Sequence, residues 1–469
     1  MFWRLDGMNS RAAAGLAALL CLFFAPRAQA GALDAREFTL DNGLRAIVVR
    51  ESKAPVVVTQ VWYRTGGADE IPGKSGVAHM LEHMMFQGTP TVPPGEFSKI
   101  ISRHGGDDNA ATSYDYTEYH VKIAADQLEL ALKLEADRMR HLLLREDDFK
   151  TENLVVREER RSRTDSDPDQ RMMEQFRIQR LAGHPYGRPV IGWMRDIEAM
   201  TATDMRQWYQ RYYAPNNAIL VVVGDVEFDQ AEALIRKDFG ALKPDPNPPR
   251  RDWAKQRAAL KPVRVTLRDP QAKAPMWMAA ATAPTLSDAA QRDDVFALDV
   301  LVTLLGDGGS SRLYRSLVLE KGMAISVGAS FSGLNLGPGE ITLYGLPREG
   351  TSIDALADAI LDQAKGLATA PIAAREIQAA KNRLLADHVY GQDSIHQTAW
   401  MIGRMTISGI PWRLGLEQYP ERIRAVTEAD LRRVAKRYFN PESMAMGTFL
   451  PAAQKPQAQV RSAAEEFPG

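Results

Sequence analysis

The pattern of apolar and polar positions predicts short strands and amphipathic helices along most of the chain. Residues 36–40 and 44–50 are expected as strands on either side of an Asp-Asn-Gly turn at 41–43, and residues 55–65 alternate as a third strand. A hairpin-like stretch follows at 109–124. Hairpins interspersed with helices favour an α+β fold of mostly antiparallel sheets packed with helices, rather than a doubly wound parallel sheet. Helical periodicity predicts first-half helices near 75–87, 95–104, 126–143 and 147–165.

A segment at 199–215 recurs at 425–441 with a constant offset and no gap. Each copy has a threonine followed three residues later by an aspartate, which is a helix N-cap signal, and a proline that ends the helix. The alternative is that two capped helices share these signals by chance. The repeat predicts two homologous domains. In the second half, strands are expected near 263–267, 276–282, 324–331 and 340–346, and helices near 290–305, 352–367, 374–391 and 428–439.

A proline-rich stretch at 244–249 lies where a boundary between two such domains should fall. The 469 residues are therefore divided into a leader, two domains of similar size, a linker between them and a polar, alanine-rich tail that we expect to be disordered. The expected segments are a signal peptide at 1–30, a metal-binding domain at 31–243, a linker at 244–260, a second domain without a metal site at 261–451, and a tail at 452–469.

The first 30 residues have the layout of a secretory signal peptide. Arg4 and Arg11 precede an uncharged apolar stretch at 12–25, and small residues follow at 28–30. The stretch is shorter than the ~20 residues that span a bilayer, so we expect cleavage, with an uncleaved membrane anchor as the alternative. The only cysteine, Cys21, lies inside this segment. Cleavage would leave a cysteine-free exported protein, which suits the periplasm, and no later membrane segment is predicted.

The overall charge excludes some partners. The chain has 58 Lys and Arg against 59 Asp and Glu, which gives a formal net charge of −1. The chain therefore lacks the basic excess that would indicate a nucleic-acid binder or a protein that binds acidic membrane surfaces.

His79, Glu82 and His83 form an H-x-x-E-H pattern within a predicted helix. Two histidines four residues apart lie one turn apart on one helix face, which is the spacing that two imidazoles need to hold one metal ion. The adjacent carboxylate of Glu82 can take a proton from a water molecule that the metal makes acidic. The alternative is a helix with surface histidines, but its neighbours are mostly apolar, and burying unpaired His and Glu is costly.

A two-histidine site needs a third protein ligand from another segment. The helix predicted at 147–165 offers Glu152, Glu158 and Glu159. With the apolar stripe of this helix centred on Val155, periodicity barely separates Glu158 from Glu159. The alternative is an ordinary acidic helix face balanced by neighbouring arginines.

These residues resemble the pitrilysin/insulinase family of inverzincin zinc metallopeptidases, and most closely its smaller members, which resemble the subunits of the mitochondrial processing peptidase. The resemblance covers nearly the whole chain after the leader. It rests on the motif at 79–83, on Phe-Gln-Gly-Thr at 86–89, on the Gly-Gly and Asn-Ala pairs within 105–110, on His-Pro-Tyr-Gly-Arg-Pro at 184–189 and on both copies of the repeated helix.

The resemblance implies a ligand set and a reaction. By position it makes His79, His83 and Glu159 the ligands of one Zn²⁺ ion per chain, with Glu82 as the general base of peptide-bond hydrolysis. The family spacing between the motif and the distal ligand favours Glu159 over its neighbour. Glu152 matches a supporting acidic residue beside the site.

The family also implies a substrate class and a mode of binding. Unfolded or extended peptides are expected to add as a strand to a sheet edge at Asn109, Ala110 and Ala111, where backbone hydrogen bonds give affinity. The alternative for this stretch is that it is only the first strand of a hairpin.

The second half departs from active members of the family. Those members carry an arginine and, seven residues later, a tyrosine that stabilise charge at the reacting carbonyl. Here Val318 and Ile325 occupy these positions, although Arg312, Tyr314 or Arg315 lie near enough in sequence to compensate. The departure predicts the zinc-bearing subunit of a two-chain peptidase, whose homologous partner lacks zinc and supplies the Arg/Tyr pair.

Two alternatives of different classes remain at this point. The first is a non-catalytic scaffold or peptide-binding subunit of the same fold. A zinc site that serves only stability is disfavoured, because structural zinc sites are closed by four protein ligands.

Overall fold

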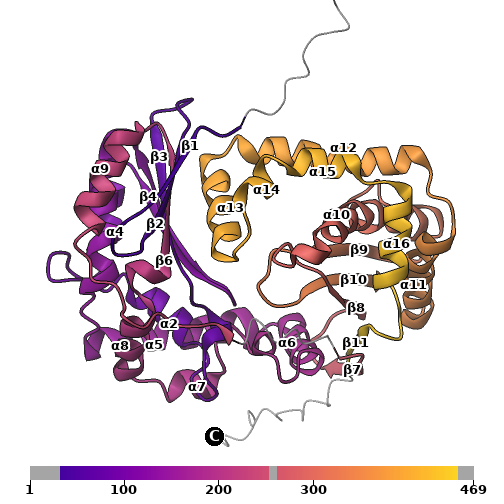
Figure 1. Ribbon diagram of the computed structural model, residues 1–469. Coiled ribbons are helices and arrows are strands. Elements are labelled where there is room, and N and C mark those ends of the chain that lie inside the picture. Colours follow the sequence, from indigo (N-terminus) through magenta and orange to yellow (C-terminus); the bar gives the residue numbers. More distant parts are fainter. Residues whose placement is uncertain (1–31, 253–260, 453–469) are drawn as a thin grey trace, which may run out of the picture. The chain divides into compact units, whose positions relative to one another are not determined.

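The computed structural model describes residues 32–252 and 261–452. The expected signal peptide with Cys21, the second part of the expected linker and nearly all of the expected tail lie outside the described residues. From Asp34 onward the chain forms one compact unit that contains two sheets (Figure 1). None of the described helices combines the length and the apolar character that a bilayer span requires.

The first half builds a six-stranded sheet in the order β1-β2-β6-β3-β5-β4. Its elements are β1 (Ala35–Thr39), β2 (Arg45–Arg50), β3 (Val56–Tyr63), η1 (Gly67–Asp69), α2 (Val77–Met84), α3 (Glu96–Arg103), β4 (Asp107–Thr112), β5 (Thr117–Ala124), η2 (Ala125–Gln127), α4 (Leu128–His141), α5 (Glu146–Arg160), η3 (Arg161–Asp165), α6 (Pro168–Arg180), η4 (Pro185–Gly187), α7 (Met194–Glu198), α8 (Ala202–Tyr212), η5 (Pro215–Asn217), β6 (Ala218–Gly224) and α9 (Phe228–Phe239).

The second half builds a five-stranded sheet in the order β7-β11-β8-β10-β9. Its elements are β7 (Arg264–Asp269), β8 (Met276–Ala283), η7 (Ala289–Gln291), α10 (Arg292–Gly306), η8 (Tyr314–Glu320), β9 (Ala324–Ser332), β10 (Gly339–Pro347), α11 (Ile353–Thr369), α12 (Ala374–Gln392), α13 (Ile395–Ile407), α14 (Trp412–Leu416), α15 (Tyr419–Ala425), α16 (Glu428–Tyr438) and β11 (Ala445–Pro451).

The two sheets repeat one topology, as the duplicated segment predicts. β2 and β6 pair in parallel, as β7 and β11 do, and the remaining pairs in both sheets are antiparallel. The repeated segment forms α8 in one half and α16 in the other, β6 and β11 follow it, and Thr201 and Thr427 each close a capping box. The α+β class and two related halves are therefore confirmed. The predicted hairpin at 41–43 is also present, with β1 paired antiparallel to β2.

Each half lends one helix to the sheet of the other half. Phe176 on α6 packs edge to face on Phe449 of β11, with ring centroids 6.0 Å apart. In return α13 lies on β3 and β6, where Trp400 meets Trp62 of the first sheet. Gly403 permits this approach, because a Cβ there would lie 2.1 Å from the Trp62 indole nitrogen. The exchange explains why the two halves form one unit.

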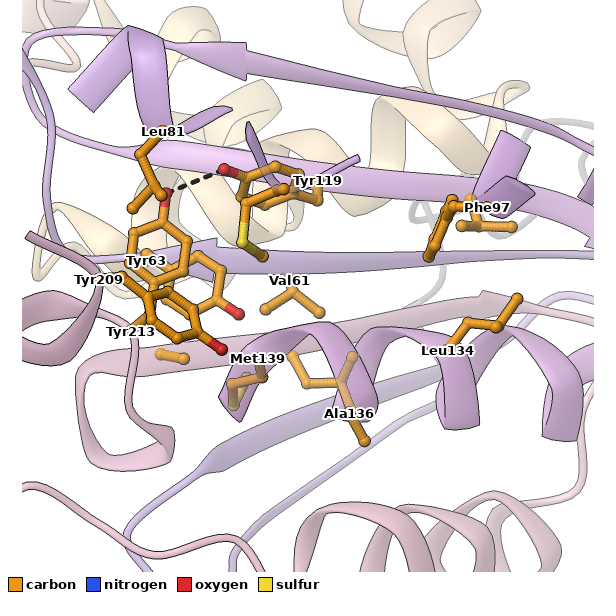
Figure 2. Close-up of a cluster of buried hydrophobic side chains, with 14 of the residues drawn as sticks. Val61, Tyr63, Leu81, Phe97, Tyr119, Leu134, Ala136, Met139, Tyr209 and Tyr213 are labelled. Atoms are coloured by element: carbon orange, nitrogen blue, oxygen red, sulfur yellow. Dashed lines mark hydrogen bonds between the residues drawn. The ribbon is translucent and has the colours of Figure 1, made fainter. Parts of the chain in front are cut away.

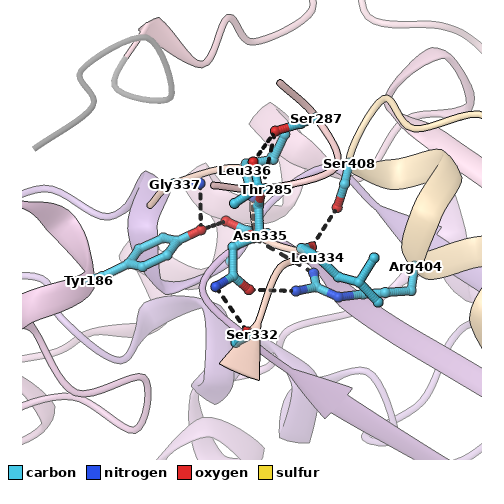
Figure 3. Close-up of polar contacts among 12 residues, drawn as sticks. Tyr186, Thr285, Ser287, Ser332, Leu334, Asn335, Leu336, Gly337, Arg404 and Ser408 are labelled. Atoms are coloured by element: carbon cyan, nitrogen blue, oxygen red, sulfur yellow. Dashed lines mark hydrogen bonds and ion pairs between the residues drawn. The ribbon is translucent and has the colours of Figure 1, made fainter. Parts of the chain in front are cut away.

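Polar contacts reinforce the exchange where two hairpin loops meet (Figure 3). The buried Tyr186 hydroxyl donates to the Asp115 carboxylate of the β4–β5 loop and accepts from the Gly337 N–H of the β9–β10 loop at 2.9 Å. Arg404 of α13 donates to the Asn335 side chain of the same loop at 3.0 Å. These hydrogen bonds link the end of β4 to the β9–β10 loop and to α13 of the second half.

A hydrophobic core fills the space between the first sheet and its helices. Figure 2 shows four of its members, Tyr63, Tyr119, Tyr209 and Tyr213, gathered beside Leu81 of α2. The Tyr119 and Tyr213 hydroxyls lie 2.9 Å apart and satisfy each other inside this core. α2 is thereby anchored through its apolar face, which fixes the direction of its opposite face.

Candidate metal centre

α2 is amphipathic, with apolar residues on one face and the residues of the H-x-x-E-H motif on the other. Its buried residues are Val77, Ala78, Met80, Leu81 and Met84. The intervening positions are those of the H-x-x-E-H motif, so burial of the apolar face turns both imidazoles and the carboxylate to the other side of the helix.

The N-terminus of α2 is held by a buried carboxylate that the sequence did not single out. Glu70 accepts hydrogen bonds from the backbone N–H groups of Gly76 and Ala78, at 2.9 and 3.0 Å. Burial raises the pKa of Glu70 to about 8 in spite of these two hydrogen bonds. Glu70 thus occupies the donors that begin the helix and fixes its position.

The structure brings His79, His83 and Glu159 together. Glu159 Oε2 lies 3.7 Å from His79 Nε2 and 3.3 Å from His83 Nε2. One ligand atom from each residue lies within 4.8 Å of the others, and no second such group occurs among residues 32–252 and 261–452. α5, which carries Glu159, packs against α2 and supplies this third side chain.

The three residues fit a zinc ion. Zinc binds imidazole nitrogen and carboxylate oxygen at about 2.0–2.2 Å, so tetrahedral ligand atoms should lie about 3.4 Å apart. The 3.3 and 3.7 Å separations agree with that spacing. Glu159 Oε2 is buried and accepts no hydrogen bond from the described residues, which leaves its lone pairs for a cation. Three protein ligands would leave a fourth position open.

Glu152 and Glu158 lie on different sides of α5. Glu152 Oε2 is 3.3 Å from His83 Nδ1, and its other oxygen accepts from the Gln87 side chain at 2.8 Å. Such a contact orients a ligating imidazole through its outer nitrogen. The Glu158 side chain is 71% exposed and pairs with Arg161. Glu159 is therefore the carboxylate of the neighbouring pair that meets the histidines.

The apolar stripe of α5 differs from the expectation. Val155 is half exposed, whereas Val156 is fully buried. The buried face also holds polar residues: Asn153 donates to the Ile197 carbonyl oxygen, and Arg160 pairs with Glu174. Because these polar side chains find partners inside, hydropathy alone placed the stripe one residue away from its true centre.

The ionisable groups of the centre perturb one another. Burial, followed by the charge of His83, lowers the pKa of His79 to about 4. Burial also acts to lower the pKa of His83, but Glu152 and Glu159 outweigh it and raise that pKa to about 9. The pKa of Glu159 is lowered by its contact with His83, and Arg163 contributes from 2.5 Å on the other carboxylate oxygen. The carboxylates of Glu152 and Glu159 therefore favour a positive charge beside them at this site.

Glu82 faces the same space without joining the ligand group. Burial raises its pKa, and a hydrogen bond from the Thr112 hydroxyl at 2.5 Å acts in the opposite direction. Thr112 is the last residue of β4, so the carboxylate lies against the end of this strand. A carboxylate with a raised pKa is a better proton acceptor than an exposed one.

β4 is the last strand of its sheet. It pairs only with β5 within the described chain, and Asn109, Ala110 and Ala111 lie along it. Asn109 and Ala111 are exposed, and Ala110 is half buried. The outer edge of β4 therefore presents unpaired backbone groups that end beside Glu82.

The corresponding place in the second half has a different character. α10 and α12 occupy the positions of α2 and α5, as their packing partners show. His388 contacts the Leu416 carbonyl oxygen, and His396 contacts His120 of the first half, and neither belongs to a group of metal-type ligands among the described residues. Ile325 is 60% exposed on β9, the edge strand of the second sheet, and presents an apolar side chain where the resemblance expects a tyrosine.

Sequence reasoning did not identify several contacts of the centre. The carboxylates of the centre are contacted by Gln87, Thr112 and Arg163. Glu70 accepts hydrogen bonds from the backbone at the start of α2. Arg163 could have been found as the residue one helical turn after Glu159. Glu70 gave no signal, because its role depends on where the chain before α2 folds back.

Two family models match the chain. The insulinase model, peptidase family M16, matches residues 45–192, and the model of the peptidase M16 inactive domain matches residues 199–384. Zinc protease PqqE from Helicobacter pylori is 34% identical over 414 residues, which cover 86% of this chain and 89% of that protein.

Two solved structures share the fold along most of this chain. The crystal structure of a protease from Helicobacter pylori covers 89% of this chain and 100% of its own, with a TM-score of 0.81 and 32% identity. The periplasmic protease PqqL from Escherichia coli shows the same fold with a TM-score of 0.75 and 21% identity, and the match covers 93% of this chain and 51% of that one. With family models matching both halves and a relative this similar along most of its length, the chain belongs to the insulinase family of peptidases, M16.

Proposed function

We propose that this chain is a zinc-dependent endopeptidase and the catalytic subunit of a two-chain enzyme. One observation carries the proposal: His79, His83 and Glu159 converge from two helices, with the half-buried Glu82 carboxylate beside them at the end of an edge strand. A zinc ion held there would supply Lewis acidity, which polarises a peptide carbonyl and makes a nearby water molecule more acidic.

The residues of the chain would then perform the proton transfers of amide hydrolysis. Glu82 accepts a proton as the water oxygen bonds to the carbonyl carbon, and the same carboxyl returns it to the leaving nitrogen as the C–N bond breaks. Thr112 donates to Glu82 and keeps one carboxylate oxygen oriented. Glu152 holds His83 through Nδ1 and so keeps its Nε2 turned toward the ligand group.

The substrate class follows from β4. An extended peptide can add as a further strand along Asn109, Ala110 and Ala111, with its backbone rather than its side chains supplying most hydrogen bonds. The register would bring a peptide bond to Thr112, where β4 ends next to Glu82. Unfolded segments meet this requirement, because their backbone groups are not already engaged in helices or sheets.

The two-chain arrangement is supported by what the second half lacks. Val318 and Ile325 carry no hydrogen-bond donor in their side chains, so this half offers no stabilising group from those positions. The full PqqL chain is about twice as long as the part that matches here, which agrees with a homologous second unit. The periplasmic location in that protein's name, together with the signal-like leader, supports export of this chain.

A reconstitution experiment tests the proposal. Hydrolysis of a fluorescence-quenched, unstructured peptide is measured for the chain alone, for a homologous chain that carries the Arg/Tyr pair without H-x-x-E-H, and for their mixture. We expect activity only in the mixture, and none when this chain carries Glu82→Gln. Full activity of the purified chain alone would refute the two-chain arrangement, and inactivity of every combination would favour a peptide-binding scaffold.

A further inference from the structure

A cavity of about 400 Å³ lies on the helix pair of the second half that corresponds to the metal-bearing pair of the first. It opens between the C-terminal end of α10, the turn that follows it, η8 and α12. The residues that matter for its chemistry are Asp307, Ser311, Arg315, Arg375, Glu376 and Arg383.

The acidic side chains of this cavity are already neutralised. Arg383 donates to the Asp307 backbone oxygen at 2.6 Å and pairs with its carboxylate at 3.2 Å. Glu376 receives a two-pronged contact from Arg312, at 3.1 and 2.8 Å. Each carboxylate thus has its own guanidinium partner, and the charge of Arg315 also acts on Glu376.

Two further guanidinium groups line the cavity, so that four arginines stand beside two carboxylates. Arg315 and Arg375 line the cavity, are exposed to solvent, and make no hydrogen bond or ion pair with the side chains that the structure describes. The chain as a whole has a formal net charge of −1, so this local excess of two positive charges does not reflect a generally basic protein. Such an excess raises the local concentration of anions.

Ser311 adds a buried polar group to the same wall. The residue is 2% exposed, and its hydroxyl has no hydrogen-bond partner in the described chain. A buried hydroxyl without a partner is unfavourable, and a hydrogen bond to a ligand oxygen would remove this cost. An oxygen-rich anion is the ligand that both the hydroxyl and the guanidinium groups can bind.

The turn before Ser311 is shaped to keep a guanidinium at the cavity wall. Gly308 has a φ of +80°, and a Cβ at this residue would lie 2.1 Å from Arg383 Nη1. Any side chain there would therefore strain the backbone and displace Arg383. The glycine allows the turn and the guanidinium to occupy adjoining space.

We propose that this cavity is a binding site for an oxyanion, held by Arg315, Arg375 and the Ser311 hydroxyl. Guanidinium groups match the paired oxygens of phosphate and carboxylate groups better than any other side chain. The ligand is either a free phosphate compound or the carboxylates of a peptide. The proposal is independent of the peptidase reaction. Under it, α2 and α5 of the first half bind a cation, whereas the equivalent helices α10 and α12 of the second half bind an anion.

Isothermal titration of the full, zinc-loaded chain tests the site. The probes are sodium pyrophosphate and N-acetyl-tetraglutamate, each at constant ionic strength. We expect one of them to bind with a stoichiometry of one per chain and to lose at least about tenfold in affinity in the Arg315→Gln/Arg375→Gln double variant. Binding of pyrophosphate alone identifies a phosphate compound as the source, and binding of the glutamate peptide identifies peptide carboxylates.

A matched variant controls for charge and for the metal. Arg103→Gln removes an exposed arginine of the first half, which pairs with Glu96, and should bind the probe as the wild type does. Any heat from pyrophosphate at the zinc ion is common to all three proteins and cancels in the comparison. The proposal is overturned if neither probe binds, or if the double variant binds as tightly as the wild type while its circular dichroism is unchanged.

Discussion

The two halves of the chain share a sheet order and a repeated helix but differ at one equivalent helix pair. In the first half, α2 and α5 direct two imidazoles and a carboxylate at one point. In the second half, α10 and α12 surround a cavity lined by arginines. The sheets and capped helices are the part of the fold that both halves need for stability, so they are alike, while the facing side chains of the helix pair are free to diverge.

The sharpest test of this contrast removes the third ligand. Glu159→Gln should lower zinc affinity roughly 10²–10³-fold, since the 10–16 kcal/mol of a structural zinc site is shared among about four ligands. Glu158→Gln is the matched control, because that side chain is largely exposed and pairs only with Arg161 among the described residues. Competition with a fluorescent chelator measures both, and equal losses in the two variants would exclude Glu159 as the ligand.

A half-buried acid in the second half gives a pH-dependent prediction. Burial raises the pKa of Asp299 on α10 to about 7, with the Tyr419 hydroxyl at 3.1 Å as its partner. The folded-state pKa of Asp299 lies above its unfolded value, so protonation of this group favours the folded chain. The resulting contribution to the free energy of unfolding is complete below about pH 4 and is lost as the pH rises through 7. We expect the wild type to lose about 2–3 kcal/mol between pH 5 and pH 8 relative to Asp299→Asn.

Urea unfolding at several pH values measures this difference. The amide oxygen of the asparagine can still accept from Tyr419, so the variant should fold. A difference between the two proteins that does not change with pH would show that Asp299 stays ionised in the folded chain.

The sequence predicted the secondary structure and the pair of histidines on one helix face more fully than the contacts between the halves. The Asp-Asn-Gly hairpin and the capping boxes depend on neighbouring residues, so local signals are sufficient for them. The exchange of α6 and α13 depends on partners such as Phe449 and Trp62, which are distant in sequence and carry no local mark. The stripe of α5 was misplaced because Arg160 is buried with its own ion partner.

Restoring the family's polar pair would make the second half more like that of an active member. Val318→Arg with Ile325→Tyr should raise peptide hydrolysis by the chain alone about tenfold or more, because donors aimed at a developing oxyanion are worth 10²–10³ when well placed. Val318→Leu with Ile325→Phe is the control for added volume without a donor. A gain in both double variants would point to packing rather than to charge stabilisation.

The repeated caps should show the smallest effect and the closest equality. Thr201 and Thr427 each accept from the backbone N–H of the aspartate three residues later, at 3.3 and 3.2 Å. Replacement of either by alanine should cost about 1 kcal/mol in the free energy of unfolding. Chemical denaturation would measure both, and a several-fold difference would show that the two repeats do not play the same structural part.

The central claim is that the first half holds zinc while Glu82 moves a proton without binding the metal. Metal content and peptide hydrolysis of Glu82→Gln, measured on the same sample together with the partner chain, test it most directly. We expect one zinc ion per chain, as in the wild type, with hydrolysis reduced by about 10²–10⁴-fold. Loss of zinc together with activity would make Glu82 a ligand, and unchanged hydrolysis would contradict its role as the base.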